Sequence, residues 1–78
     1  MSATTHSSYE YRGYNIRIDR YRQPQDHDLW TATYRITRAS DGALATHGAI
    51  AGVYRLPKEA EAGAKNAAYF WIETQVQS

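Results

Sequence analysis

The sequence contains no cysteine, which excludes disulfide bonds and zinc sites built on thiolates. It also lacks a long apolar run: the longest, residues 67–72, falls far short of the roughly 20 residues that a membrane-spanning helix needs. The first residues have neither the basic start nor the apolar segment of a signal peptide. We therefore expect a cytoplasmic protein that does not engage a membrane.

The chain is short and has little net charge. With 78 residues it has room for one domain, whose net stability is expected to be about 3–5 kcal/mol. We assign residues 1–8 to a disordered tail, 9–75 to the folded domain and 76–78 to a C-terminal tail. A domain of this size has no room for a deep cleft, which counts against an enzyme. The net charge of +1 does not by itself indicate a polyanionic partner.

Alternation of apolar and polar residues predicts strands in the first half of the chain. The first strand is expected over residues 9–22, with a bulge or bend at Gly13 that brings the two preceding tyrosines back toward the core. A polar loop then leads to a second strand over residues 29–38. The core side of these two strands is predicted to carry Tyr14, Ile16, Ile18, Trp30, Ala32, Tyr34 and Ile36.

The second half of the chain predicts one more strand and one helix. Asp41-Gly42 signals a turn, and a third strand rich in alanine and glycine is expected over residues 43–54. Pro57 predicts the first position of a helix, where its missing N–H does no harm. At 100° per residue the helix has one apolar stripe, which consists of Ala60, Gly63, Ala64, Ala67 and Trp71. Ala68, Phe70 and Ile72 lie along its edges.

These segments together predict an α+β domain. It is a three-stranded antiparallel sheet in the order β-β-β-α, with the single C-terminal helix packed on one face. We expect Trp71 on the helix to meet Trp30 and Tyr34 in the core, together with Ile16 and Ile18.

Residues capable of catalysis or metal binding are scattered. His6 falls in the expected tail, His27 in a loop between two aspartates, and His47 in the third strand, so none has the spacing of a metal site. The serines fall in the tails or in a turn, where Ser40 and Asp41 fit turn chemistry. We therefore expect no cofactor, no metal and no enzymatic activity.

The sheet face opposite the helix is the remaining candidate surface. A three-stranded sheet offers about 300 Å² there, less than the roughly 600–1,000 Å² that one DNA-binding module buries. The candidate contact residues for a partner or a nucleic acid are Arg17, Tyr21, Thr33 and Arg35. Asp19 on the same face would oppose a phosphate backbone.

Three short motifs resemble the plant AP2-type and phage-integrase arm-binding domains. They are Tyr11-Arg12-Gly13-Tyr14, Leu29-Trp30-Thr31-Ala32 and Leu56-Pro57-Lys58-Glu59-Ala60, within a layout that extends from residue 11 to residue 73. The resemblance implies a three-stranded sheet that enters the DNA major groove, backed by a C-terminal helix. Those domains are strongly basic, whereas this chain is nearly neutral, and only Arg17 and Arg35 carry over as DNA contacts. The layout is at least as similar to that of small uncharacterised bacterial proteins, a resemblance that implies no known activity.

Two hypotheses of function follow. The first is a small non-enzymatic binding or protein-interaction domain that uses the open sheet face or pairs, with a protein partner or with itself, through an edge of the first or third strand. The alternative is a DNA-binding domain that uses the exposed sheet face.

Overall fold

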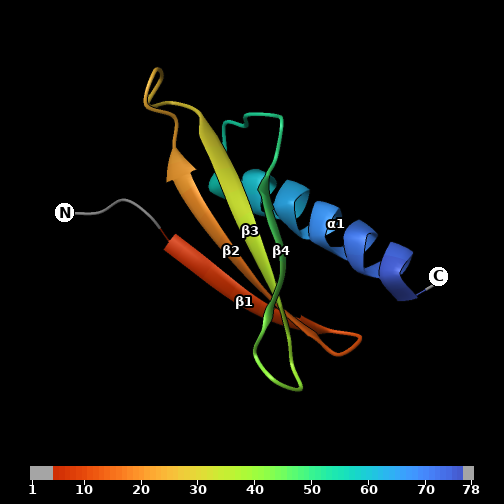
Figure 1. Ribbon diagram of the computed structural model, residues 1–78. Coiled ribbons are helices and arrows are strands. Elements are labelled where there is room, and N and C mark those ends of the chain that lie inside the picture. The colour runs from red at the N-terminus through yellow and green to blue at the C-terminus, as the bar shows by residue number, and fades with distance from the viewer. Residues whose placement is uncertain (1–4, 77–78) are drawn as a thin grey trace.

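The computed structural model describes residues 5–76 and has one antiparallel sheet with one C-terminal helix (Figure 1). The α+β class and the helix that begins at Pro57 are confirmed. The sheet, however, has four strands where three were predicted. In chain order the elements are β1 (Thr5–Tyr11), β2 (Tyr14–Arg22), β3 (Trp30–Arg38), β4 (Leu44–Ala49) and α1 (Pro57–Val76).

The additional strand arises at Arg12-Gly13, where a bulge was predicted and a tight hairpin is found. Arg12 has a φ of 50° and Gly13 a φ of 85°. Positive φ at both central residues is the type I′ geometry that joins two strands with two residues. Tyr11 therefore pairs with Tyr14 on the same face of the sheet. This reversal, rather than a bulge, places the tyrosines of β1 on the helix side.

The hairpin also moves the start of the sheet. Residues 5–8, expected as part of a tail, form the first half of β1 and pair with β2. Residues 1–4 and 77–78 lie outside the described part of the chain. All neighbours in the sheet are consecutive and antiparallel, so the strand order is β1-β2-β3-β4.

The predicted turns lie where their residues indicate. The backbone N–H of Asp28 donates to the Asp26 carboxylate in the β2–β3 loop. At the next turn the N–H of Ala43 donates to the Asp41 carboxylate, and Gly42 has a φ of 73°. A short polar side chain that accepts from the backbone two residues on stabilises such turns.

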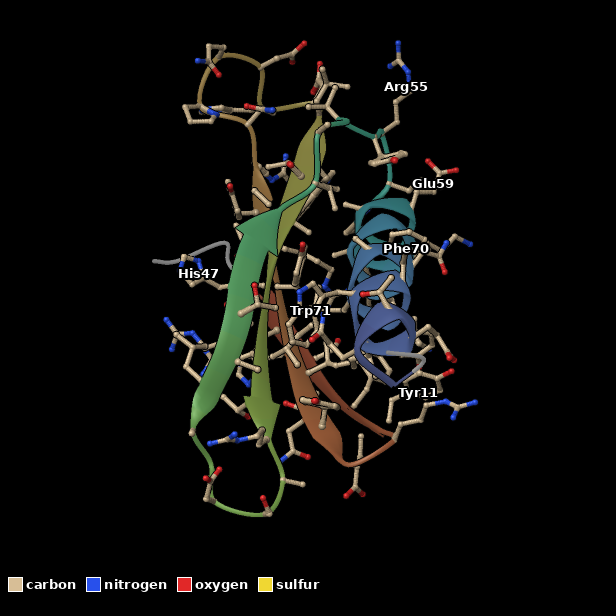
Figure 2. The ribbon with its side chains drawn as sticks, turned by 45° about the vertical axis from the view of Figure 1, so that its right-hand side comes forward. Tyr11, His47, Arg55, Glu59, Phe70 and Trp71 are labelled. Atoms are coloured by element: carbon tan, nitrogen blue, oxygen red, sulfur yellow. The ribbon has the colours of Figure 1, made fainter. Side chains whose placement is uncertain are left out.

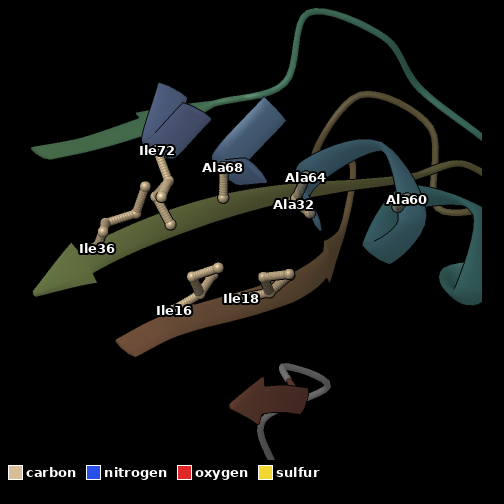
Figure 3. Close-up of a cluster of buried hydrophobic side chains, with 8 residues drawn as sticks. All are labelled: Ile16, Ile18, Ala32, Ile36, Ala60, Ala64, Ala68 and Ile72. Carbon is tan, nitrogen blue, oxygen red and sulfur yellow. The ribbon is translucent and has the colours of Figure 1, made fainter. Parts of the chain in front are cut away.

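The core lies between α1 and the central strands β2 and β3 (Figure 3). It consists of isoleucine and alanine: Ile16, Ile18, Ala32, Ile36, Ala60, Ala64, Ala68 and Ile72. The four helix members recur every fourth residue. Their alanines allow α1 to lie close to the sheet, and Ile72 fills the wider end.

The prediction that Trp71 and Trp30 meet in the centre of the core is wrong. The buried stripe of α1 is rotated from the predicted one, so Trp71 is half-buried and Phe70 is exposed. Trp71 packs edge-on against Tyr14, which pairs with the last residue of β3, whereas Trp30 is the first residue of β3. The nine residues of β3 separate these ends by about 26 Å, so the tryptophans cannot meet.

The third predicted strand is shorter than expected. As β4 it ends at Ala49, and the chain then returns to a single bridge between Tyr54 and Trp30. The Tyr34 ring lies over Gly48, where a Cβ would come within 2.7 Å of the hydroxyl. The glycine in this strand therefore accommodates an aromatic ring of the sheet.

Candidate interaction surfaces

The four predicted contact residues all lie on the sheet face opposite α1. Arg17 of β2 stands directly opposite Arg35 of β3, and Thr33 is two residues along from Arg35. Tyr21 is four residues from Arg17, about 13 Å along the strand. The structure therefore brings the two arginines together, keeps Thr33 near them and leaves Tyr21 apart.

The pair of arginines belongs to a row that crosses the whole sheet. Ser8 of β1 pairs with Arg17, and His47 of β4 pairs with Arg35. Figure 2 shows His47 on the side of the sheet away from α1. Like charges directly opposite one another destabilise a sheet, and Arg17 is offset by Asp19, whose carboxylate lies 3.3 Å from its Nε.

Two open hollows flank Arg35 on this face. One, of about 610 Å³, is bordered by Ser8, Asn15 and Arg17. The other, of about 480 Å³, is bordered by Thr33 and His47 among others. Glu10 borders the first hollow and Asp19 the second, so the face carries charge of both signs.

The remaining arginines do not converge on this face. Four have their own partners elsewhere: Arg12 with Glu73 at 3.1 Å, Arg20 with Glu61 at 3.2 Å, Arg38 with Asp41 at 2.9 Å, and Arg22 over the Trp30 ring at 5.0 Å. An extended basic surface of the kind that neutralises many phosphates is therefore not formed by the described residues.

Along the β1 margin, polar side chains join the strand to the helix. Glu61 of α1 accepts hydrogen bonds from the hydroxyls of Ser7 and Tyr9, and it forms an ion pair with Arg20. The ammonium group of Lys65 lies 4.2 Å from the centre of the Tyr9 ring. We call these five residues the polar seam.

The polar seam shifts the pKa values of its two central groups. The hydrogen bond from Tyr9, with smaller contributions from Ser7, Arg20 and Lys65, holds the pKa of Glu61 below its usual range although burial opposes this. The same hydrogen bond, helped by burial and by the Glu61 charge, raises the pKa of Tyr9 above its ordinary value. The seam therefore favours a carboxylate beside a neutral phenol.

A second contact group continues along the same margin toward the C-terminal end of α1. The Tyr11 hydroxyl donates to the Glu73 carboxylate, and the Tyr11 ring stacks on Tyr69 with centroids 4.3 Å apart. Arg12 pairs with the same carboxylate. Hydroxyls, rings and charges thus line the helix side of β1.

The β4 margin has the opposite character. Residues 43–54 contain no Lys, Arg, Asp or Glu. Exposed apolar side chains follow this margin: Leu44 is 54% exposed and Val53 43%. At 100° per residue, Gly63 and Trp71 lie on the flank of α1 opposite to Glu61 and Tyr69. Phe70 lies farther from the sheet on the same flank and is 72% exposed.

Two residues of β4 direct backbone hydrogen-bonding groups outward. The N–H of Ile50 donates to the Ala32 carbonyl of β3, and bonded and non-bonded positions alternate along an antiparallel strand. Gly48 therefore bonds inward, while the N–H and C=O groups of His47 and Ala49 point to the open edge. In Figure 2 no other strand or helix lies across this edge.

Other classes of site find no geometric support in the described residues. Within residues 5–76, no three His, Asp or Glu side chains lie close enough to hold a metal ion. No described helix is long and apolar enough to cross a membrane.

Comparison of the chain with family models, with curated proteins and with solved structures finds no match in any of the three. The surfaces themselves are therefore the basis for an assignment. Sequence reasoning missed the polar seam, although Glu61, Lys65, Tyr69 and Glu73 recur every fourth residue and so mark a polar flank of the helix.

Proposed function

We propose that this protein is a small non-enzymatic interaction domain that binds a protein partner through the edge of β4. The observation that carries this proposal is the difference between the two margins of the sheet. The β1 margin is lined on its helix side by the polar seam and the Tyr11–Glu73 group, whereas the β4 margin has no Lys, Arg, Asp or Glu and exposes Leu44 and Val53.

Protection against edge pairing is the usual property of an exposed strand. Lysines, prolines and inward-pointing charges prevent an edge strand from recruiting another chain. β4 has none of these over the six residues Leu44–Ala49. An added strand would satisfy the outward groups of His47 and Ala49, and its side chains would cover the neighbouring apolar residues.

A synthetic peptide with the sequence of residues 43–51 provides a strand-shaped probe. Titrated into the ¹⁵N-labelled chain, it is expected to shift amide resonances along β4, His47 and Ala49 most, and to leave β1 unchanged. A peptide of the same composition in scrambled order is the control. Absence of shifts at millimolar peptide, or shifts confined to β1, would remove the proposal.

The alternative proposal is a DNA-binding domain that uses the open sheet face, in keeping with the AP2-type resemblance. It is supported by the in-register pair Arg17 and Arg35 with its flanking hollows. It is opposed by Asp19 and Glu10 on the same face and by the engagement of the other arginines in separate contacts.

Duplex DNA separates the two proposals. If the alternative holds, DNA shifts the amides of Arg17, Thr33 and Arg35 in a salt-sensitive way, and Arg35→Gln weakens the effect. Arg55→Gln is the matched control, because Arg55 is an exposed arginine outside the sheet. No salt-sensitive shift at these three amides eliminates the DNA-binding alternative.

A further inference from the structure

The backbone of β4 has a repeat that fits a second copy of itself. His47 and Ala49 carry the outward hydrogen-bonding groups, and Gly48 lies midway between them. In an antiparallel pair with its two-fold axis at Gly48, His47 of one copy stands opposite Ala49 of the other. Each of these two equivalent pairs exchanges two hydrogen bonds, so all four outward N–H and C=O groups of each copy's two residues are satisfied.

We propose that the partner of the β4 edge is a second copy of this chain, paired antiparallel about Gly48. The inference rests on the proposed function of that edge and adds the identity of the partner. The result is a continuous eight-stranded sheet with both helices on one face, because residues opposite one another in an antiparallel pair share a face. A two-fold contact of this kind uses the same patch on both copies and closes on itself.

Charge favours this occupant. A foreign strand with acidic or basic residues would find no Lys, Arg, Asp or Glu among residues 43–54, whereas a second copy brings a strand that likewise has none of them. On the open face, the axis at Gly48 places His47 beside the small Ala49 of the other copy. An axis at His47 would instead place the two His47 side chains opposite each other, and each would also have Arg35 of its own copy beside it on β3.

The shape of β4 also selects this register. The pairing of β3 with β4 is irregular between Ile36 and Thr37, which leaves Ala45 without a regular partner. An axis at His47 would require Ala45 to bond with Ala49 of the other copy, through the irregular part of the strand. The axis at Gly48 uses only the regular part.

On the helix face, the pairing brings apolar groups of the two copies toward each other without helix contact. Gly48 opposite Gly48 leaves space that the Tyr34 rings border, since each ring already lies over its own glycine. Strand spacing puts the two helices about 19 Å apart, roughly twice the 8–10 Å of packed helices. The contact is thus limited to the strands and the side chains beside them.

A contact of this extent is small. Interfaces below about 1,200 Å² are typically weak or transient, so we expect a dissociation constant of roughly 0.1–1 mM. Sedimentation equilibrium of the full chain from about ten micromolar to several millimolar covers this range. The expected result is a reversible monomer–dimer equilibrium, and a strict monomer throughout would overturn the proposal.

Proline substitution on the two edges gives a matched pair of variants. The N–H of Ala49 points outward from β4, and that of Ser8 points outward from β1, so proline removes no hydrogen bond within the folded chain at either position. Ala49→Pro is expected to weaken dimerisation at least about tenfold, and Ser8→Pro to leave it unchanged. Equal effects of the two variants contradict pairing through β4.

Two further readouts keep the result unambiguous. If Ala49→Pro does not fold, Ala49→Lys replaces it, because a lysine there faces His47 of the other copy and is expected to weaken the dimer in the same direction. The peptide of residues 43–51 separates the two proposals: if it binds at β4 while the full chain stays monomeric, self-pairing fails and the proposed function stands. If the peptide also fails to bind, both fail.

Discussion

Replacing Glu61 with alanine tests whether the polar seam joins β1 to the helix. The carboxylate accepts from Ser7 at 2.9 Å and from Tyr9, and it lies 3.2 Å from Arg20 with a side chain that is 19% exposed. Hydrogen bonds to charged groups contribute about 1.5–3 kcal/mol, and residual water contact lowers this. The substitution also leaves Arg20, whose Nε is already buried without a described partner, with no counter-charge. We expect Glu61→Ala to lower the free energy of unfolding by about 2–4 kcal/mol.

That loss is most of the stability of such a small domain. A change of 1 kcal/mol shifts the melting temperature by about 4–8 °C in a domain of this length, so thermal unfolding followed by circular dichroism will detect it. Glu59→Ala is the matched control, because Glu59 lies on the exposed side of the same helix and should change stability by less than about 1 kcal/mol.

A double-mutant cycle isolates the contact between the strand and the helix. Tyr9→Phe removes only the hydroxyl, and we expect a coupling energy between Tyr9 and Glu61 of about 1–2 kcal/mol. A coupling energy below about 0.3 kcal/mol would show that the two side chains act independently. The seam would then contribute nothing specific to the position of β1.

Three further predictions concern pH, the core and the first hairpin. The lowered pKa of Glu61 adds stability that is present above the usual carboxylate range and is lost as pH falls through the folded-state pKa. The raised pKa of Tyr9 adds stability that is present below its ordinary value and is lost as pH rises through the folded-state pKa. Glu61→Gln should therefore flatten both the acid and the alkaline limb of a stability–pH curve from urea titrations, and unchanged limbs would contradict this assignment. Ile72→Ala should destabilise the domain by about 2–4 kcal/mol in urea unfolding and Phe70→Ala by less than about 1, because the first side chain is fully buried and the second mostly exposed. The reverse order would contradict the burial of Ile72 against the sheet. Gly13→Ala should cost about 1 kcal/mol by thermal unfolding, since its φ of 85° strains any side chain although open space surrounds it, and a neutral effect would argue against the two-residue turn.

Local patterns were sufficient for much of the fold. Alternation along residues 14–18 and 30–36 identified the helix side of β2 and β3, and Pro57 marked the start of α1. The fourth strand was missed because Arg12-Gly13 is not one of the dipeptides that strongly signal a type I′ turn. The hairpin requires a positive φ at Arg12 as well as at Gly13, which is an uncommon conformation for a residue with a side chain.

The rotation of the helix stripe has a different cause. A helix rich in alanine has a weak apolar pattern, so neighbouring stripes differ little in hydrophobicity. Long-range contacts determine which stripe faces the sheet. The polar seam holds Glu61 toward β1, and this places Ala64, Ala68 and Ile72 over the sheet instead of Trp71. Contacts between residues more than fifty positions apart are not encoded in local periodicity.

The candidate surface could be predicted only in part, because part of it also depends on contacts that are distant in the sequence. Arg17 and Arg35 were correctly placed on one face, because strand parity alone fixes the face of a residue. The contrast between the two edges depends on which strands are outermost and on the side chains that cover each margin. Neither was accessible without the fourth strand.

Hydrogen exchange at the two sheet edges tests the central claim most directly. The amides of His47 and Ala49 on β4, and those of Ser8 and Glu10 on β1, all point outward from the sheet. If β4 is the edge that pairs, protection of His47 and Ala49 will rise with protein concentration while Ser8 and Glu10 stay unprotected. Protection that is independent of concentration, or that rises equally at both edges, would contradict pairing of two copies through β4.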